Sequence, residues 1–176
     1  MKKEKKIGIL LKSISFAARA HRHHFRKDKK TPYVSHPFRV CMILRQVLGV
    51  EDEEILAAAV LHDTIEDTTT DRDDLEKRFS ENVAQWVSLL SKDKRMKESV
   101  REAAYLRQLK DAPLPVRLIK LADVYDNLTD AVNLSPKGQR KMGKTAMKYL
   151  SLFKGDYPAM IGVLPEIKRL ANGFLR

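Results

Sequence analysis

The sequence is poor in residues that tie a chain together covalently or interrupt its helices. It has one cysteine, Cys41, in 176 residues, which excludes an internal disulfide and, among apolar neighbours, indicates a buried thiol in a reducing compartment. Seven glycines and seven prolines, beside 43% hydrophobic and 32% charged residues, exclude collagen-like and low-complexity chains. Length and composition therefore predict one domain over residues 1–176, large enough to fold without disulfide or zinc staples.

Long hydrophobic runs are also missing. The basic opening leads into an apolar stretch that Lys12 cuts too short for the core of a signal peptide. No other stretch approaches the roughly eighteen apolar residues needed to span a membrane. We therefore expect a cytoplasmic protein without a membrane partner.

No segment shows the alternation of apolar and polar residues that is typical of a strand, and no internal repeat is present. Apolar residues instead recur every three or four positions, and residues 53–63 have almost no polar face, which predicts a buried central helix. The prediction is an all-α, single-domain helical bundle of eight or nine helices, over about residues 7–24, 36–48, 53–67, 71–79, 80–90, 98–109, 115–134, 137–153 and 158–174.

The formal net charge of +11 favours anionic partners. The basic residues occur in separate runs, 2–6, 22–30, 92–97 and 137–148, without the interleaved aromatic residues of a stacking platform for nucleic acid. An anionic nucleotide is therefore the favoured partner, and nucleic-acid binding is the less favoured one. The oligomeric state is open.

His62 and Asp63 are adjacent at the end of the predicted buried helix, and Glu66 and Asp67 follow one turn later. Adjacent side chains on a helix point about 100° apart, so an ion between them can contact both. Residues four apart share a face, which would place Glu66 beneath His62 and Asp67 beneath Asp63. One helix would thus present two ligands and two further carboxylates to a single pocket.

His36, flanked by Pro32 and Pro37, and Asp123 offer an imidazole and a carboxylate from two other predicted helices. With His62 and Asp63 they form a mixed nitrogen and oxygen set that suits manganese, iron or zinc better than calcium. Such an ion can activate water and polarise a phosphoryl oxygen, and Glu66 and Asp67 could then move protons. Each motif taken alone has a simpler alternative. His62 and Asp63 could be a self-satisfied buried pair, His36 could merely begin a helix, and Asp123 could be a polar residue on an amphipathic helix.

The ordered set resembles the HD-domain superfamily, and its surroundings resemble the hydrolase domain of the RelA/SpoT alarmone enzymes, including their small single-domain forms. The likeness spans about residues 16–153. It rests on Ala20-His21, Arg26-Lys27, Thr31-Pro-Tyr-Val-Ser-His-Pro37, Ala58-Ala-Val-Leu-His-Asp-Thr-Ile-Glu-Asp-Thr68 and Leu118-Ile-Lys-Leu-Ala-Asp123 with Asn127.

The resemblance implies a divalent metal, usually manganese, and removal of the 3′-pyrophosphate from guanosine tetra- or pentaphosphate. It implies that His36, His62, Asp63 and Asp123 hold the metal and that Glu66 and Asp67 serve catalysis. By the same resemblance, Arg26, Lys27 and Asn127 contact nucleotide or phosphate. We add Tyr149 as a residue that could close the pocket.

The chain departs from the family pattern at two positions after Asp123. Asp126 stands where the family usually has histidine, and Thr129 where it usually has arginine, which removes positive charge near the expected phosphate site. Two alternatives therefore stay open. One is an HD-type phosphohydrolase for another nucleotide, such as a nucleoside monophosphate or a nicotinamide dinucleotide phosphate; the other is a catalytically weak nucleotide-binding or nucleic-acid-binding module.

Overall fold

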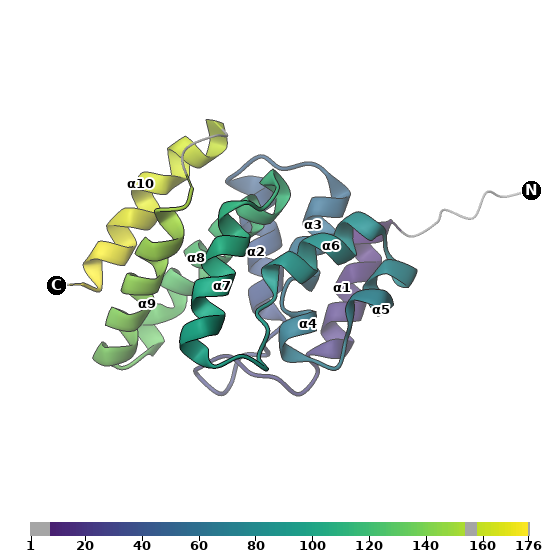
Figure 1. Ribbon diagram of the computed structural model, residues 1–176, viewed down its shortest axis with the longest axis horizontal. Helices are drawn as coiled ribbons and strands as arrows, with labels where there is room; N and C mark the ends of the chain where they lie inside the picture. The colour runs from purple at the N-terminus through teal and green to yellow at the C-terminus, as the bar shows by residue number, and fades with distance from the viewer. Residues whose placement is uncertain (1–7, 154–157, 176) are drawn as a thin grey trace, which may run out of the picture.

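The computed structural model describes residues 8–153 and 158–175, and over these ranges the chain is a set of packed helices without a strand (Figure 1). A single bridge pairs Phe25 with Pro32 in the loop before the second helix. The all-α prediction is confirmed. The helices are α1 Ile9–Ala20, α2 Ser35–Gln46, α3 Glu53–Leu61, α4 Thr64–Asp67, α5 Arg72–Arg78, α6 Glu81–Leu90, α7 Glu98–Lys110, α8 Leu114–Thr129, the 3-10 helix η1 Asp130–Asn133, α9 Pro136–Leu150 and α10 Pro158–Gly173.

Two helices carry the core. Every residue of α3 from Leu56 to Leu61 is buried, as its lack of a polar face predicted, and α8 buries nine of its sixteen residues. α3 packs against α1, α2, α6 and α8, while α8 also packs against α9 and α10. In Figure 1, α9 and α10 lie at one end of the molecule, α1 and α5 lie at the other, and α2 and α8 lie between. None of the described helices is long and apolar enough to cross a bilayer.

Local sequence signals set where these helices begin. The Asp52 carboxylate accepts hydrogen bonds from the backbone N–H groups of Glu54 and Ile55, so it caps the buried helix at its positive end. Ser135 caps α9 in the same way through the N–H of Gly138. Gly49, with φ of +66°, lets the chain leave α2 through a left-handed residue.

The structure corrects the predicted helices in two places. The helix predicted over 53–67 ends at Leu61, and its continuation is the separate four-residue helix α4. Asp63, at φ −100° and ψ −1°, departs from helical geometry, and the buried Thr64 hydroxyl donates to the carbonyl of Leu61 across the break. The helix predicted over 115–134 likewise tightens into η1 after Thr129. Ile7, the predicted start of the first helix, lies outside the described residues.

Candidate functional site

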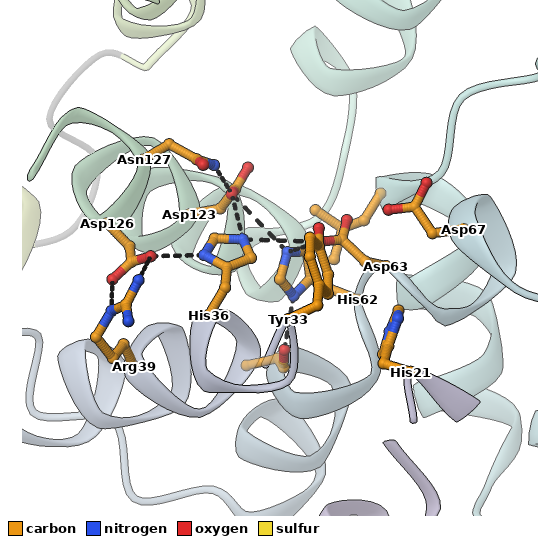
Figure 2. A network of polar contacts seen from close by, with 12 residues as sticks. His21, Tyr33, His36, Arg39, His62, Asp63, Asp67, Asp123, Asp126 and Asn127 are labelled. Carbon is orange, nitrogen blue, oxygen red and sulfur yellow. Dashed lines mark hydrogen bonds and ion pairs between the residues drawn. The ribbon is translucent and has the colours of Figure 1, made fainter. Parts of the chain in front are cut away.

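Four side chains from three helical regions point toward one another (Figure 2). His36 belongs to the first turn of α2, His62 and Asp63 follow α3, and Asp123 lies in α8. One donor atom each of His36, His62 and Asp123 lies within 4.8 Å of the others. Asp63 Oδ2 lies 3.1 Å from His62 Nε2 and 3.6 Å from His36 Nε2. We call these four residues the donor cluster.

His62 presents one nitrogen to the cluster and anchors the other. Its Nδ1 lies 2.8 Å from the carbonyl oxygen of Ala59, which can only accept, so Nδ1 carries the proton. Its Nε2 is buried and, despite its closeness to Asp63, makes no hydrogen bond within the described residues. In the neutral imidazole, the buried lone pair on Nε2 is costly unless something else binds it. This geometry suits a metal ligand.

His36 is oriented by a carboxylate. Its Nδ1 donates to Asp126 Oδ2 at 2.6 Å, and its Nε2 lies 3.1 Å from Asp123 Oδ1. Arg39 holds the Asp126 carboxylate from its far side through two hydrogen bonds, of 2.6 and 3.0 Å. The family departure at Asp126 was expected to alter the phosphate site, but its carboxylate is buried and engaged by His36 and Arg39. The Thr129 hydroxyl, the second departure, donates to the carbonyl of Asp126.

The two carboxylates of the donor cluster are also held in place. The Tyr33 hydroxyl donates to Asp63 Oδ2 at 2.6 Å. Lys120 Nζ donates to Asp123 Oδ2 at 2.7 Å, and Asn127 Nδ2 donates to Asp123 Oδ1 at 2.5 Å. Lys120 Nζ also lies 4.5 Å from the centre of the Tyr149 ring and 5.4 Å from that of Tyr105. These contacts fix the rotamers of both carboxylates before any ligand arrives.

The electrostatics of the cluster favour a cation. Burial acts to lower the pKa of the His62 imidazole, but the adjacent Asp63 carboxylate outweighs burial and raises that pKa to about 9. Burial acts to raise the pKa of Asp123, but Lys120 and the two imidazoles hold it well below its usual range. With both imidazoles neutral, the two carboxylates carry two negative charges, which a divalent ion would neutralise. The donor set thus fits a divalent metal and does not by itself distinguish manganese, iron and zinc.

Glu66 and Asp67 lie on α4 but have separate partners. Glu66 Oε2 accepts a hydrogen bond of 3.0 Å from the backbone N–H of Lys92, and burial raises the pKa of its carboxyl group. Asp67 Oδ1 lies 2.6 Å from Lys94 Nζ. The prediction of one continuous helix through both pairs is wrong, because α3 ends at Leu61 and α4 begins at Thr64. Asp67 still follows Asp63 by one helical turn, since its backbone N–H donates to the Asp63 carbonyl at 2.9 Å. The catalytic role of Glu66 and Asp67 stays a prediction.

The predicted nucleotide contacts lie on the Asp123 side of the cluster. Arg26 is buried, and its guanidinium binds Asp130 at 2.7 Å and Asn127 Oδ1 at 3.3 Å. Asn127 therefore joins Arg26 to Asp123. Lys27 is exposed and forms no hydrogen bond or ion pair within the described residues. Tyr149 is buried and lines a small cavity with Lys120, Asp123 and Asn127.

Several supporting residues were missed in the sequence, although their spacing carried a signal. Lys120 precedes Asp123 by three residues, so both lie on one side of α8. Tyr33 precedes His36 by three residues and lies in the turn before α2. Asp126 follows Asp123 by three and contacts the same imidazole. Arg39 had no such signal, because its partner Asp126 lies on another helix, 87 residues away.

Comparisons with known proteins agree with this geometry. A model of the HD domain family matches residues 13–153. Human guanosine-3′,5′-bis(diphosphate) 3′-pyrophosphohydrolase MESH1 is 39% identical over 130 residues, which cover 73% of each chain. An Aquifex aeolicus guanosine-3′,5′-bis(diphosphate) 3′-pyrophosphohydrolase is 34% identical over 140 residues, 78% of this chain but 20% of that longer protein.

A solved structure shares the whole fold. It is described as a metazoan ortholog of SpoT that hydrolyses ppGpp, and it superposes with a TM-score of 0.86 at 29% identity, covering 98% of this chain and 99% of the other. A Listeria monocytogenes protein, lmo0812, superposes with a TM-score of 0.67 at 27% identity, covering 82% and 96%. With its helices, its converging histidines and aspartates and these relatives, the chain belongs to the HD domain family.

Proposed function

We propose that this protein hydrolyses guanosine 3′,5′-bis(diphosphate) to GDP and pyrophosphate, with a divalent metal held by His36, His62, Asp63 and Asp123. The observation that carries the proposal is the convergence of His36, His62 and Asp123, although His36 and Asp123 lie 87 positions apart in the sequence. The names of the relatives support the substrate. Manganese is the proposed ion, with iron and zinc as the other metals that suit the donor set.

The reaction replaces the bond between phosphorus and the ribose 3′ oxygen by a bond between phosphorus and a water oxygen. Water must lose a proton and the 3′ oxygen must gain one. A divalent ion in the donor cluster supplies Lewis-acid activation of the phosphoryl group and acidification of water. Glu66, whose pKa is raised by burial, is the proposed base, and Asp67 is the proposed partner in proton transfer.

Of the remaining predicted residues, one is proposed to position a neighbour and three are proposed to bind the nucleotide. Arg26 is proposed to act through Asn127, because its guanidinium is already engaged by Asp130 and Asn127. Asn127, Lys27 and Tyr149 are proposed to contact the nucleotide. Lys27 is exposed and has no ion-pair partner among the described residues, while Tyr149 lines the cavity beside Asp123. We propose one domain for the chain as well, since α3 and α8 connect both ends of the helical set.

A direct assay tests the proposal. The purified protein with Mn²⁺ is offered guanosine 3′,5′-bis(diphosphate), nucleoside monophosphates and nicotinamide dinucleotide phosphate, and both pyrophosphate and orthophosphate are measured. We expect pyrophosphate release from the first substrate only. Orthophosphate release from the other nucleotides, with no pyrophosphate from the first, would overturn the proposed substrate.

A further inference from the structure

A cavity of about 630 Å³ adjoins Asp67, on the other side of the donor cluster from Asn127 (Figure 2). Residues at the end of α1 form one part of its lining, among them Arg19, Arg22 and His24. The chain between α4 and α5 forms the other part. We call this space the Asp67 cavity.

The donor cluster has a cavity at each of two ends. In Figure 2, Asn127 lies at one end of the polar network and Asp67 at the other, with the two imidazoles of the cluster between them. Asn127 lines the small cavity beside Asp123, and that cavity shares no lining residue with the Asp67 cavity. Asp67 is one helical turn from Asp63, because its backbone N–H donates to the Asp63 carbonyl at 2.9 Å. A ligand at the cluster can therefore extend in two directions.

The Asp67 cavity offers two arginines that no carboxylate engages within residues 8–153 and 158–175. The Arg19 side chain is exposed and forms no hydrogen bond or ion pair in these ranges. The Arg22 side chain is also exposed, and it donates only to the imidazole of the neighbouring His23, at 2.9 Å. Both guanidinium groups can therefore turn toward an anion without first breaking an ion pair.

Two carboxylates, of Asp67 and Asp74, also line the cavity. Asp67 Oδ1 lies 2.6 Å from Lys94 Nζ, so its charge is balanced from outside the cavity. With Lys94 counted, three cations face two carboxylates, and the positive excess lies with the two arginines. His24 adds a polar group: its Nδ1 lies 3.1 Å from Nδ1 of the buried His21, which leaves its Nε2 to bind a ligand.

The space beside Glu66 is the other place at this end of the site where an anion could bind. It is smaller, at about 420 Å³, and its cations are already engaged. Each of the three has an ion-pair partner: Lys92 with Glu102, Lys94 with Asp67 and Arg95 with Asp93. An anion there would have to displace a carboxylate, whereas at Arg19 it would not.

We propose that the Asp67 cavity binds the distal phosphate of the pyrophosphate group that is cleaved and retains it until that product leaves. The nucleoside is proposed to lie at the Asn127 end, which leaves the Asp67 end for the phosphate that departs with the attacked phosphorus. The planar guanidinium groups of Arg19 and Arg22 can each bind two phosphate oxygens. The cavity would thereby favour a pyrophosphate over a single phosphate as the cleaved group, an inference that rests on the proposed function.

The kinetic test measures inhibition by each product in two variants. The cavity variant is Arg19→Gln/Arg22→Gln. The control variant, Arg107→Gln/Lys168→Gln, removes two cations that are exposed, lie outside the cavity and have no ion-pair partner among the described residues. Hydrolysis of guanosine 3′,5′-bis(diphosphate) is followed with added pyrophosphate or added GDP, at a constant concentration of free Mn²⁺.

We expect the inhibition constant of pyrophosphate to rise at least about tenfold in the cavity variant, the loss of one charged hydrogen bond or more. The inhibition constant of GDP should stay the same, and the control variant should match the unmodified protein. An unchanged constant for pyrophosphate would overturn the inference. So would an equal rise for both products, because it would show a general effect of charge and not a site for pyrophosphate.

A binding test does not depend on hydrolysis. Pyrophosphate and orthophosphate are each titrated calorimetrically into the full chain with Mn²⁺ present. The cavity variant should bind pyrophosphate at least about tenfold more weakly than the control variant, whereas orthophosphate, which has no distal phosphate, should bind both variants equally. If pyrophosphate binding depends on Arg19 and Arg22 but guanosine 3′,5′-bis(diphosphate) releases no pyrophosphate, the cavity site stands and the proposed reaction fails. Equal pyrophosphate binding by both variants, or an equal loss for both anions, would overturn the cavity site.

Discussion

The donor cluster and a basic cleft of about 840 Å³, which residues of α7 and α9 line, differ in how their charges are paired. In the cluster each carboxylate has a hydrogen-bonded partner: Asp63 has Tyr33, and Asp123 has Lys120 and Asn127. In the cleft four exposed cations have no partner among the described residues: Lys137, Arg140, Lys144 and Lys148. The cluster is arranged in advance for one small ion, whereas the cleft can adapt to a flexible anion.

From this difference we expect the two regions to have different roles. Fixed, buried donors impose geometry on the reacting atoms, where an error of about 1 Å is costly. Exposed, mobile cations attract and retain an anion but impose little geometry, and salt weakens them. Mutations in the cluster should therefore affect turnover, and mutations in the cleft should affect binding.

The largest effect should come from the cluster itself. His62→Ala or Asp63→Ala should lower turnover by at least about a thousandfold and remove bound metal, because the donors act as a unit. Glu66→Ala should lose turnover equally but keep the metal, since Glu66 lies outside the donor set. Metal content by mass spectrometry, measured beside activity, distinguishes the two results. Retained metal in His62→Ala would break the assignment of that histidine.

Lys120 tests whether fixed pairing matters for stability. Lys120→Met should lower the free energy of unfolding by about 3 kcal/mol, because it leaves the buried Asp123 carboxylate without its cation. Lys120→Arg, which keeps the charge, should lose less. Urea denaturation in the presence of chelator measures both. If the Met variant were as stable as the unmodified protein, Lys120 would not be needed to hold Asp123.

A substitution at Asp126 tests whether the hydrogen bond to His36 Nδ1 orients that imidazole for the metal. Asp126→Asn keeps the shape but removes the charge that His36 and Arg39 bind, so metal affinity should fall about 10- to 100-fold. Arg39→Gln should have a smaller effect in the same direction. Calorimetric titration with Mn²⁺ measures both. Unchanged affinity in Asp126→Asn would show that packing alone orients His36.

The raised pKa of His62 predicts how metal affinity depends on pH. Below about pH 9 the metal-free imidazole carries a second proton, on Nε2, which an incoming ion must displace, so affinity should fall as the pH falls. The expected change is up to about tenfold per pH unit for each proton displaced. Titrations with Mn²⁺ at pH 7, 8 and 9, in buffers of different ionisation enthalpy, report affinity and proton release together. An affinity that is flat over this range would contradict the prediction.

The smallest effect should come from an exposed pair at the rim of the cleft. Glu98 and Lys141 lie 3.5 Å apart with side chains 71% and 78% exposed, so solvent screens them. Glu98→Gln should change the free energy of unfolding by less than about 0.5 kcal/mol. The measurement is the same urea denaturation. A loss comparable to that of Lys120→Met would erase the distinction between the two regions.

Much of the fold followed from local patterns. The apolar run before His62 predicted the buried helix α3, and Pro115 predicted the first turn of α8, because both signals act within a few residues. The break after Leu61 was missed, since no glycine or proline marks it and the side-chain bond from Thr64 is not visible in a pattern of hydrophobicity. The short helix α4 follows from that break.

The sequence predicted which residues form the site but not which residues support them. The motif order identified His36, His62 and Asp123, which the structure brings together. The pairing of Asp126 with Arg39 joins α8 to α2 and depends on how two helices pack, which sequence spacing does not reveal. The basic residues of 137–148 looked like one of several scattered runs until α9 aligned them along the cleft.

His36 and His62 differ in the group that fixes the tautomer of each imidazole. His36 depends on a side chain, Asp126, whereas His62 donates to the main-chain carbonyl of Ala59. A point mutation can delete a carboxylate but not a peptide oxygen, so any descendant that keeps α3 inherits the His62 orientation. Attempts to retune which ion the protein prefers should therefore begin at the α2 imidazole, where the supporting group is replaceable, and leave the other histidine alone.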